Sequence, residues 1–320
     1  MNEQKRSSIG IIIPVFNEET IIEVFHHDLL NVLKVLENPW KIYYVNDGST
    51  DQTEEIIINL SKENPKITLI SLTRNFGHQA ALSCGIDYAT EDIIITMDGD
   101  GQNPPEVIPE MLSLHKAGYD IVIGQRQDNS SESKYKNISS KFFYQLLNRI
   151  GEINITPNAA DFRLLSRKVV DSIKSMPEYH RFLRGMINWL GYKTIILPFS
   201  PKPRLGGHSK YTFKKMAMLA SDAIFSFSLV PLKIGLAIGG LFFLLAFLEV
   251  LYVTSLWLTG NQDNLAPGWS SLMFIILLVG GTLTTVVSLL GIYIGYIFQE
   301  VKNRPIYIIN DIHQVEEKQS

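Results

Sequence analysis

The chain of 320 residues has a single cysteine, Cys84, and therefore cannot form an internal disulfide. A protein without disulfides suits a thiol-reducing compartment. An excess of one charge is also missing, because 29 lysines and arginines stand against 32 aspartates and glutamates, for a formal net charge of -3. Such a chain lacks the broad basic field that attracts nucleic acids, and we expect no nucleic-acid partner.

Several short motifs are absent as well. No spacing of cysteine and histidine typical of a zinc site is present. No glycine-rich loop of the phosphate-cradling type follows the first apolar segment. The polar start, residues 1–8, lacks the basic and then apolar pattern of a secretory signal, so we expect no such leader.

Short apolar segments rich in branched residues alternate with segments of helical periodicity over the first 124 residues. This alternation predicts an α/β domain over residues 1–200, with a mostly parallel sheet covered by helices on both faces. The expected strands are 9–15, 41–46, 67–73, 92–97, 119–124 and 192–198. The expected helices are 18–36, 51–62, 77–89, 104–117, 134–149, 166–176 and 181–190.

Long apolar runs are concentrated in the last third of the chain. Residues 235–258 carry one charge, Glu249, and residues 270–298 carry none. A helix needs about 20 apolar residues to cross a bilayer. We therefore predict two membrane helices within residues 229–258 and 269–299, joined by an external loop at 259–268.

The basic residues around these runs predict their orientation. The connector 259–268 has no lysine or arginine, whereas Lys233 precedes the first run and Lys302 follows the second. Basic residues are enriched on the cytoplasmic side. The α/β domain and the tail 300–320 are thus expected in the cytoplasm, attached to a multi-pass anchor in the cytoplasmic membrane. A basic loop and an amphipathic helix at 201–228 are expected along the membrane surface.

Polar residues directly follow four of the expected strands, at 14–19, 46–51, 74–75 and 98–102. Ligands of parallel sheets bind beyond the carboxyl ends of the strands, so these segments should converge on one crevice. Two carboxylates one residue apart, Asp98 and Asp100, suit a hard divalent cation that also grips a diphosphate. A solvated turn is the alternative for that pair.

Other residues at strand ends are weaker candidates. Asp47 stands where a carboxylate can accept hydrogen bonds from a base or ribose. Arg74 and Arg126 could contact phosphate, although for Arg74 a structural ion pair is the alternative. His78 starts a helix and is expected to be a surface or supporting residue.

Together these segments resemble glycosyltransferase family 2, in the GT-A fold. The stretches IPVFNEE, VNDGSTD and DGDGQ match that family in order and spacing. The further stretches LTRNFGHQAAL, NAADFRLLSRKVV, RLGGHSKY and FSFSLVPLK look like one branch of it. That branch is the bacterial polyprenyl-phosphate glycosyltransferases with two C-terminal spans, the GtrB/CsbB-like group, related to dolichyl-phosphate mannose synthase. The resemblance covers about residues 9–310.

The resemblance implies roles for individual residues. Asp98 and Asp100 would bind Mg2+ or Mn2+, and Asp161 would lie at the reacting centre as a base, with Asp100 and Arg163 beside it. The nucleotide-sugar site would comprise Pro14, Phe16, Glu18, Asp47, Asp98 and Gln102, together with the candidate Arg74. The acceptor phosphate would meet Arg204 and Lys210, with His208 between them. A phosphate monoester has a second pKa of about 6 and needs little help from a base, so Asp161 could instead position substrate.

The implied reaction is metal-dependent, inverting, non-processive transfer of a sugar from a UDP-sugar to undecaprenyl phosphate or another polyprenyl phosphate at the cytoplasmic membrane face. Glucose is the first expectation and N-acetylglucosamine the second. A processive polysaccharide synthase is an alternative, although its Gln-x-x-Arg-Trp motif is absent. A nucleotidyltransferase and a non-catalytic membrane scaffold are further alternatives, and intact carboxylates argue against the scaffold. A homo-oligomer, possibly a tetramer, is expected from the relatives.

Overall fold

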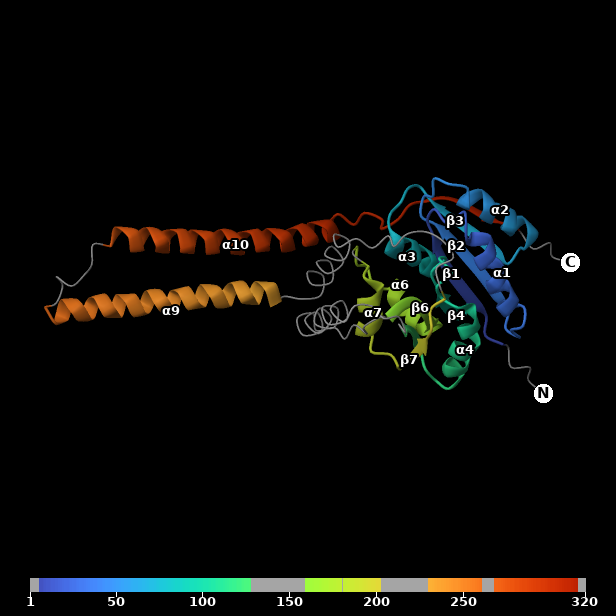
Figure 1. Cartoon of the computed structure of the whole chain (residues 1–320), viewed down its shortest axis with the longest axis horizontal. Helices are drawn as coiled ribbons and strands as arrows, with labels where there is room; N and C mark the ends of the chain where they lie inside the picture. The colour runs from blue at the N-terminus through green and yellow to red at the C-terminus, as the bar shows by residue number, and fades with distance from the viewer. Residues whose placement is uncertain (1–5, 128–158, 180, 203–229, 261–267, 316–320) are drawn as a thin grey trace.

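The computed structural model describes residues 6–127, 159–179, 181–202, 230–260 and 268–315 (Figure 1). The predicted helix at 134–149 and almost all of the predicted interfacial segment 201–228 lie outside these residues. The described chain forms an α/β domain from which two long helices extend (Figure 1).

The strands and helices lie within a few residues of most of the predicted ranges. The strands are β1 (Ile9–Val15), β2 (Trp40–Asn46), β3 (Ile67–Leu72), β4 (Ile93–Thr96), β5 (Ile121–Arg126), β6 (Ala159–Ser166), β7 (Thr194–Phe199) and β8 (Ile309–Gln314). The helices are α1 (Ile22–Leu33), α2 (Thr53–Glu63), α3 (His78–Tyr88), α4 (Ile108–Lys116), α6 (Arg167–Lys174), α7 (Leu183–Trp189), α9 (Val230–Leu258) and α10 (Trp269–Val301), with a short 3-10 helix, η1 (Pro105–Val107), before α4.

The described strands form one sheet in the order β7-β5-β6-β4-β1-β2-β3-β8. Strands β4, β1, β2 and β3 pair in parallel, as do β5 and β7. Strand β6 runs antiparallel between β4 and β5, and β8 runs antiparallel to β3 at the edge. The mostly parallel sheet that the sequence predicts is confirmed, and two antiparallel strands that were not predicted are added to it.

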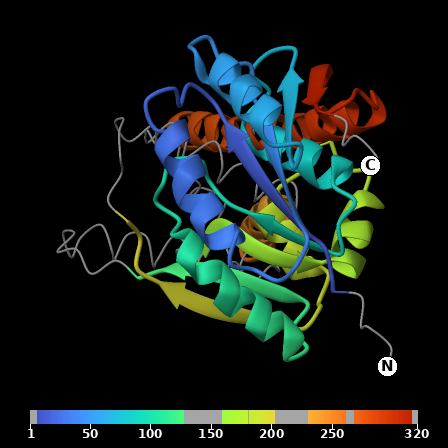
Figure 2. The ribbon, with the colours of Figure 1, turned by 90° about the vertical axis from the view of Figure 1, so that its right-hand side faces the viewer.

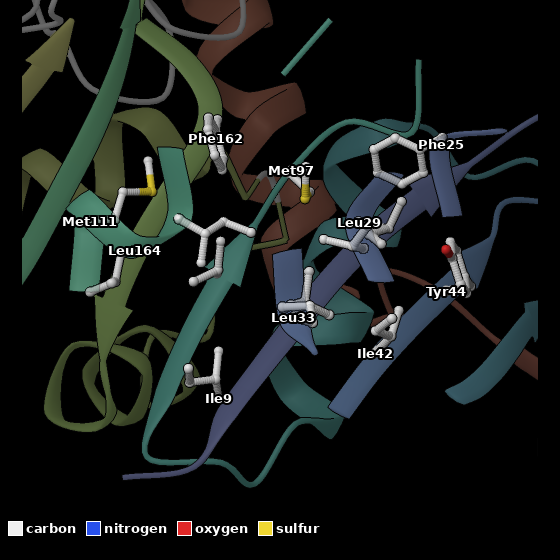
Figure 3. Packing of buried hydrophobic residues seen from close by; sticks show 14 of the residues in the cluster. Ile9, Phe25, Leu29, Leu33, Ile42, Tyr44, Met97, Met111, Phe162 and Leu164 are labelled. Carbon is white, nitrogen blue, oxygen red and sulfur yellow. The ribbon is translucent and has the colours of Figure 1, made fainter. Parts of the chain in front are cut away.

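Buried apolar side chains form a layer on each face of the sheet. Along β1, Ile11 and Ile13 point to one face and Ile12 to the other, because successive side chains of a strand alternate. Helices α1, α2 and α4 cover the first face, and α3, α6 and α7 cover the second (Figure 2). Figure 3 shows part of the first layer, in which Phe25 of α1 packs with strand residues such as Tyr44.

The two long helices lie side by side (Figure 1). Within the described residues one stretch is long and apolar enough to cross a membrane, Leu278–Val301 of α10. It overlaps most of the second predicted span, 269–299. The apolar stretch Leu232–Phe242 of α9 is shorter, so the first predicted span stays a prediction.

After α10 the chain returns to the sheet. Residues 302–308 connect the helix to β8, which pairs with β3 from Thr68 to Leu72. The segment predicted as a tail, 300–320, therefore contributes a strand to the α/β domain. The sequence of β8 is polar, and half of its side chains are exposed. It therefore contains no apolar run from which a strand could be predicted.

Candidate active site

The carboxyl ends of the central strands meet at one edge of the sheet, as predicted. A Cβ atom on Gly99 would lie 3.2 Å from Cγ1 of Val15 and 3.5 Å from the carbonyl oxygen of Pro14, so the segment after β4 packs on the end of β1. A Cβ atom on Gly48 would lie 2.5 Å from the carbonyl carbon of Arg74, so the segments after β2 and β3 also touch.

The acidic segment after β4 is a folded loop. The backbone N–H of Gln102 donates to Oδ1 of Asp100 at 3.0 Å, and the side-chain amide of Asn103 lies 3.4 Å from Oδ2 of Asp98. Gly101 adopts a φ of 73°, in the left-handed region that favours glycine. Asp98 and Asp100 are each partly exposed, so their carboxylates can be reached from the crevice.

Two cationic side chains face Asp98. Arg126, at the end of β5, lies 3.5 Å from Oδ2 of Asp98 and donates to Oε1 of Gln102 at 3.1 Å. His78, the first residue of α3, places Nε2 3.4 Å from Oδ1 of Asp98. Burial, with the nearby charges of Asp161 and Asp100, raises the pKa of Asp98 above its ordinary value despite these cations.

Asp161 is buried, whereas Asp98 and Asp100 are partly exposed. Arg184 of α7 holds it through two hydrogen bonds, from Nε at 2.9 Å and from Nη2 at 2.8 Å. Arg163 lies behind it, with Nη2 3.6 Å from Oδ1, and Nε2 of His78 lies 3.5 Å from Oδ2. Burial opposes the ionisation of Asp161, but Arg184 outweighs it and holds the pKa of Asp161 well below its usual range.

His78 thus links Asp161 of β6 to Asp98 of the loop after β4. Although the side chain is 41% exposed, desolvation of its ring disfavours the charged form, but the hydrogen bond to Asp161 and the charge of Asp98 outweigh that effect and raise the pKa of His78. A histidine that gains acidic partners stays protonated to higher pH. The edge of the sheet therefore carries acidic and cationic groups in alternation, an arrangement suited to a ligand that bears both a metal ion and phosphates.

Asp47 supports the neighbouring loop. The backbone N–H of Phe76 donates to one carboxylate oxygen of Asp47 at 2.7 Å, and that of Gly77 donates to the other at 2.9 Å. The residue is 3% exposed, and burial raises its pKa although these donors oppose the shift. Arg74 of the same loop stacks its guanidinium over the Phe76 ring, 4.0 Å from the centroid. Asp47 therefore orders the loop that leads to His78.

Replacement of Gly48 by alanine tests how tightly these loops touch. Gly48 has a φ of 69° and no room for a Cβ, whereas Gly118 has a φ of 94° and only Nζ of Lys193 near, at 3.9 Å. We expect Gly118→Ala to lose about 1–2 kcal/mol of stability through backbone strain. Gly48→Ala should lose about 1–3 kcal/mol more through overlap with the backbone at Arg74. Unfolding of both variants measures the difference, and equal losses would show that the loops can part.

The structure brings most of the predicted residues together. Asp98, Asp100, Gln102, Asp161 and Arg163 belong to one network of hydrogen bonds and close charge contacts. The remaining donor-site candidates lie at adjoining strand ends and loops: Pro14, Phe16, Glu18, Asp47 and Arg74. The acceptor candidates lie outside the described residues: Arg204, His208 and Lys210.

Two residues of the network were not predicted for it. His78 was expected at the surface or in a supporting position, and its proximity to a strand end was the signal that could have placed it. Arg184 lies on α7, far from any parallel strand end in sequence, and no local pattern marks it. Arg163 is 3% exposed, and its Nη1 has no hydrogen-bond partner among the described residues.

The described residues contain no group of three or more side chains arranged to hold a metal ion. The pair Asp98 and Asp100 still fits a divalent cation. Mg2+ in particular is commonly held by one or two carboxylates, with substrate phosphates and water completing its coordination. Both carboxylates are partly exposed and lie on a loop whose glycines let a ligand approach.

The family model described as Glycosyl transferase family 2 matches residues 10–174, which is more than half of the chain. The chain belongs to glycosyltransferase family 2. This glycosyltransferase is 40% identical over 308 residues to an uncharacterized glycosyltransferase of Synechocystis sp., with 96% of each chain covered. It is 38% identical over 309 residues to a prophage-derived bactoprenol glucosyl transferase of Shigella flexneri, covering 96% of this chain and 98% of the other.

Among solved structures, mannosyl-3-phosphoglycerate synthase from Rubrobacter xylanophilus superimposes with a TM-score of 0.50 at 13% identity. The match covers 68% of this chain and 72% of that one, and it shows a shared fold. The family membership that the sequence motifs predict is confirmed.

Proposed function

We propose that this glycosyltransferase moves glucose from UDP-glucose to a polyprenyl phosphate, such as undecaprenyl phosphate, at the cytoplasmic face of the membrane. The observation that carries the proposal is the similarity, over nearly the whole chain, to a relative whose name joins glucose and bactoprenol. A membrane lipid as acceptor also agrees with the candidate membrane stretch Leu278–Val301.

The donor would bind at the acidic loop. Asp98 and Asp100 would hold Mg2+ or Mn2+, which when bound neutralises the charge that develops on the departing diphosphate. Arg126 orients Gln102 and approaches Asp98, which places a fixed cation beside the proposed diphosphate site. Asp47 orders the loop on which the base and ribose would rest.

The reaction would be a single displacement with inversion. An oxygen of the lipid phosphate bonds to C1 of glucose as the bond from C1 to the diphosphate breaks and UDP leaves. The attacking phosphate is largely a dianion at neutral pH. Asp161, held ionised by Arg184 and Arg163, would position sugar or acceptor rather than take a proton.

A lipid acceptor requires the protein to be attached to the membrane. Exposing a polyprenyl chain to water costs about 0.8 kcal/mol for each CH2, so the site must come to the lipid headgroup. We propose that α9 and α10 both cross the membrane, with the α/β domain cytoplasmic. Arg204, His208 and Lys210 would bind the acceptor phosphate. The protein would form a homo-oligomer, such as a tetramer, in the membrane.

Purified full-length protein in lipid vesicles tests the proposal. UDP release from UDP-glucose should require both undecaprenyl phosphate and Mg2+ or Mn2+, and should stop on chelation. A panel with UDP-N-acetylglucosamine and GDP-mannose should show a preference for UDP-glucose, with one sugar added to each lipid. UDP release that does not depend on undecaprenyl phosphate would contradict the proposal of a lipid acceptor. Products with several sugars on one lipid would favour a processive synthase.

A further inference from the structure

Asp87, near the end of α3, joins three parts of the chain. Nη1 of Arg181, which precedes α7, donates to both carboxylate oxygens of Asp87, at 3.0 and 2.9 Å. The hydroxyl of Tyr307, beyond α10, donates to Oδ2 of Asp87 at 3.0 Å. Burial and the Asp87 carboxylate raise the pKa of Tyr307, so its hydroxyl remains a donor at neutral pH.

The chain between α10 and β8, residues 302–308, leaves the helix in a defined direction. Asn303 has a φ of 47°, the left-handed conformation that ends helices, and Pro305 prevents the helix from continuing. The carboxylate of Glu300 accepts the backbone N–H of Tyr179 at 2.9 and 3.1 Å. A negative charge is unfavourable at a helix C-terminus, so this contact with the α/β domain gives Glu300 a compensating partner.

The same segment reaches the edge of the active site. The carbonyl of Ile308 accepts the backbone N–H of Thr73, directly before the loop that Asp47 orders. Helices α3 and α7, which Asp87 and Arg181 join, carry His78 and Arg184, and both of these side chains contact Asp161. Hydrogen bonds, together with the backbones of α3 and α7, therefore connect the end of α10 to the residues around Asp161.

We propose that residues 302–308 form a strap that fixes the active site at one position and orientation relative to the membrane, with Asp87, Arg181 and Tyr307 as its positioning residues. The inference rests on the proposed function, because a fixed position and orientation of the site relative to the membrane matters only if the acceptor is embedded in the bilayer. As positioning residues, Asp87 and Tyr307 would touch neither donor nor acceptor. They act through α3 and α10.

The physical reason is the cost of orienting two reactants. A lipid phosphate is confined to the headgroup plane, and a site held at the correct height and angle meets it without a further loss of orientational freedom. If the strap is loosened, the α/β domain can reorient relative to the membrane, and it must return to the correct height and angle before each turnover. An acceptor that diffuses freely in water can reach the site in any orientation of the domain, so its rate of transfer should not depend on the strap.

Tyr307→Phe is the appropriate variant, because it removes one hydroxyl and keeps the ring. With undecaprenyl phosphate in vesicles we expect kcat/KM for the acceptor to fall about 10- to 100-fold, the loss typical of a hydrogen bond to a charged group. With a short, water-soluble prenyl phosphate, kcat/KM and the KM for UDP-glucose should stay within about twofold. Tyr192→Phe, which removes a hydroxyl bonded to Ser172 and outside the strap, is the matched control and should change neither.

Hydrogen exchange in the same vesicles gives a second readout, which needs no turnover. Tyr307→Phe should speed exchange of residues 302–309 and leave β1 unchanged, and an unchanged strap would overturn the proposal. Equal losses with both acceptors, or no loss with either, would also overturn it while leaving the proposed function intact. If the unaltered chain transferred sugar to neither acceptor, the proposed function would fail and the positioning role with it.

Discussion

Asp100→Asn is expected to lower turnover by about 100- to 1,000-fold, because a divalent cation at the diphosphate supplies several kcal/mol of charge stabilisation. The fold should survive the change. Asp100 is partly exposed, and the asparagine oxygen can still accept the N–H of Gln102. Turnover measured against the concentration of Mg2+ or Mn2+ should show both a lower maximum and a higher requirement for metal. Asp98→Asn should act in the same direction.

Asp120→Asn provides the matched control. The Asp120 side chain is 17% exposed, compared with 23% for Asp98, and it pairs with Lys168 at the opposite end of the sheet. Its replacement should leave turnover and metal requirement unchanged. Unaltered metal dependence in both Asp98→Asn and Asp100→Asn would refute the assignment of this pair as the metal site.

Asp161→Asn is expected to destabilise the protein by roughly 3–5 kcal/mol, the usual effect of breaking a buried ion pair on one side. Arg163 is 3% exposed and would lose the charge of its close partner. Thermal unfolding of the full chain measures the loss. Asp171, whose side chain is 60% exposed and lies 3.5 Å from Arg167, is the control, and Asp171→Asn should cost less than about 1 kcal/mol. Adding Arg163→Met to Asp161→Asn should restore part of the stability, and no restoration would contradict the explanation.

The pH dependence separates positioning from base catalysis at Asp161. A folded pKa held well below the ordinary value means that this carboxylate stabilises the fold above the unfolded pKa of about 3.9. That contribution disappears as the pH falls through the folded value. Between about pH 6.5 and 8.5 Asp161 does not titrate, so any change of rate there should come from another group, such as His78, whose pKa is raised by its acidic neighbours. The rate should also decline near pH 6 as the acceptor phosphate gains a proton. Because Asp161 also raises the pKa of His78, His78→Gln is the control. A rate that follows one enzyme ionisation near neutrality in the unaltered chain and in His78→Gln, but not in Asp161→Asn, would identify Asp161 as a base.

The parallel part of the sheet could be predicted because each strand is a short run of branched apolar residues, such as IGIIIPV in β1. The acidic loop could be predicted for the same reason, since its place after a buried strand follows from that pattern. Strand β6 could not. It carries Asp161 and Arg163 in the interior, where only partners distant in sequence make burial tolerable.

The cationic partners of Asp161 could not be predicted from the sequence for a similar reason. Arg184 reaches the site because α7 packs on the second face of the sheet, which is a tertiary relation with no local signature. His78 was noticed at a helix start, but its two acidic neighbours come from β6 and from the loop after β4, and their meeting is a matter of sheet order. Predictions from strand ends alone therefore found the acidic residues and missed two of the cations.

The position of β8 determines when the sheet can be completed during synthesis. Its partner β3 ends at Leu72, but β8 begins only at Ile309, after both long helices have been made. At 5–20 residues per second the ribosome needs on the order of 10 to 50 s to pass from one to the other. During that time the edge of β3 is open to pairing with other chains. The nascent protein is thus expected to depend most on chaperones while the chain between β3 and β8 is being made.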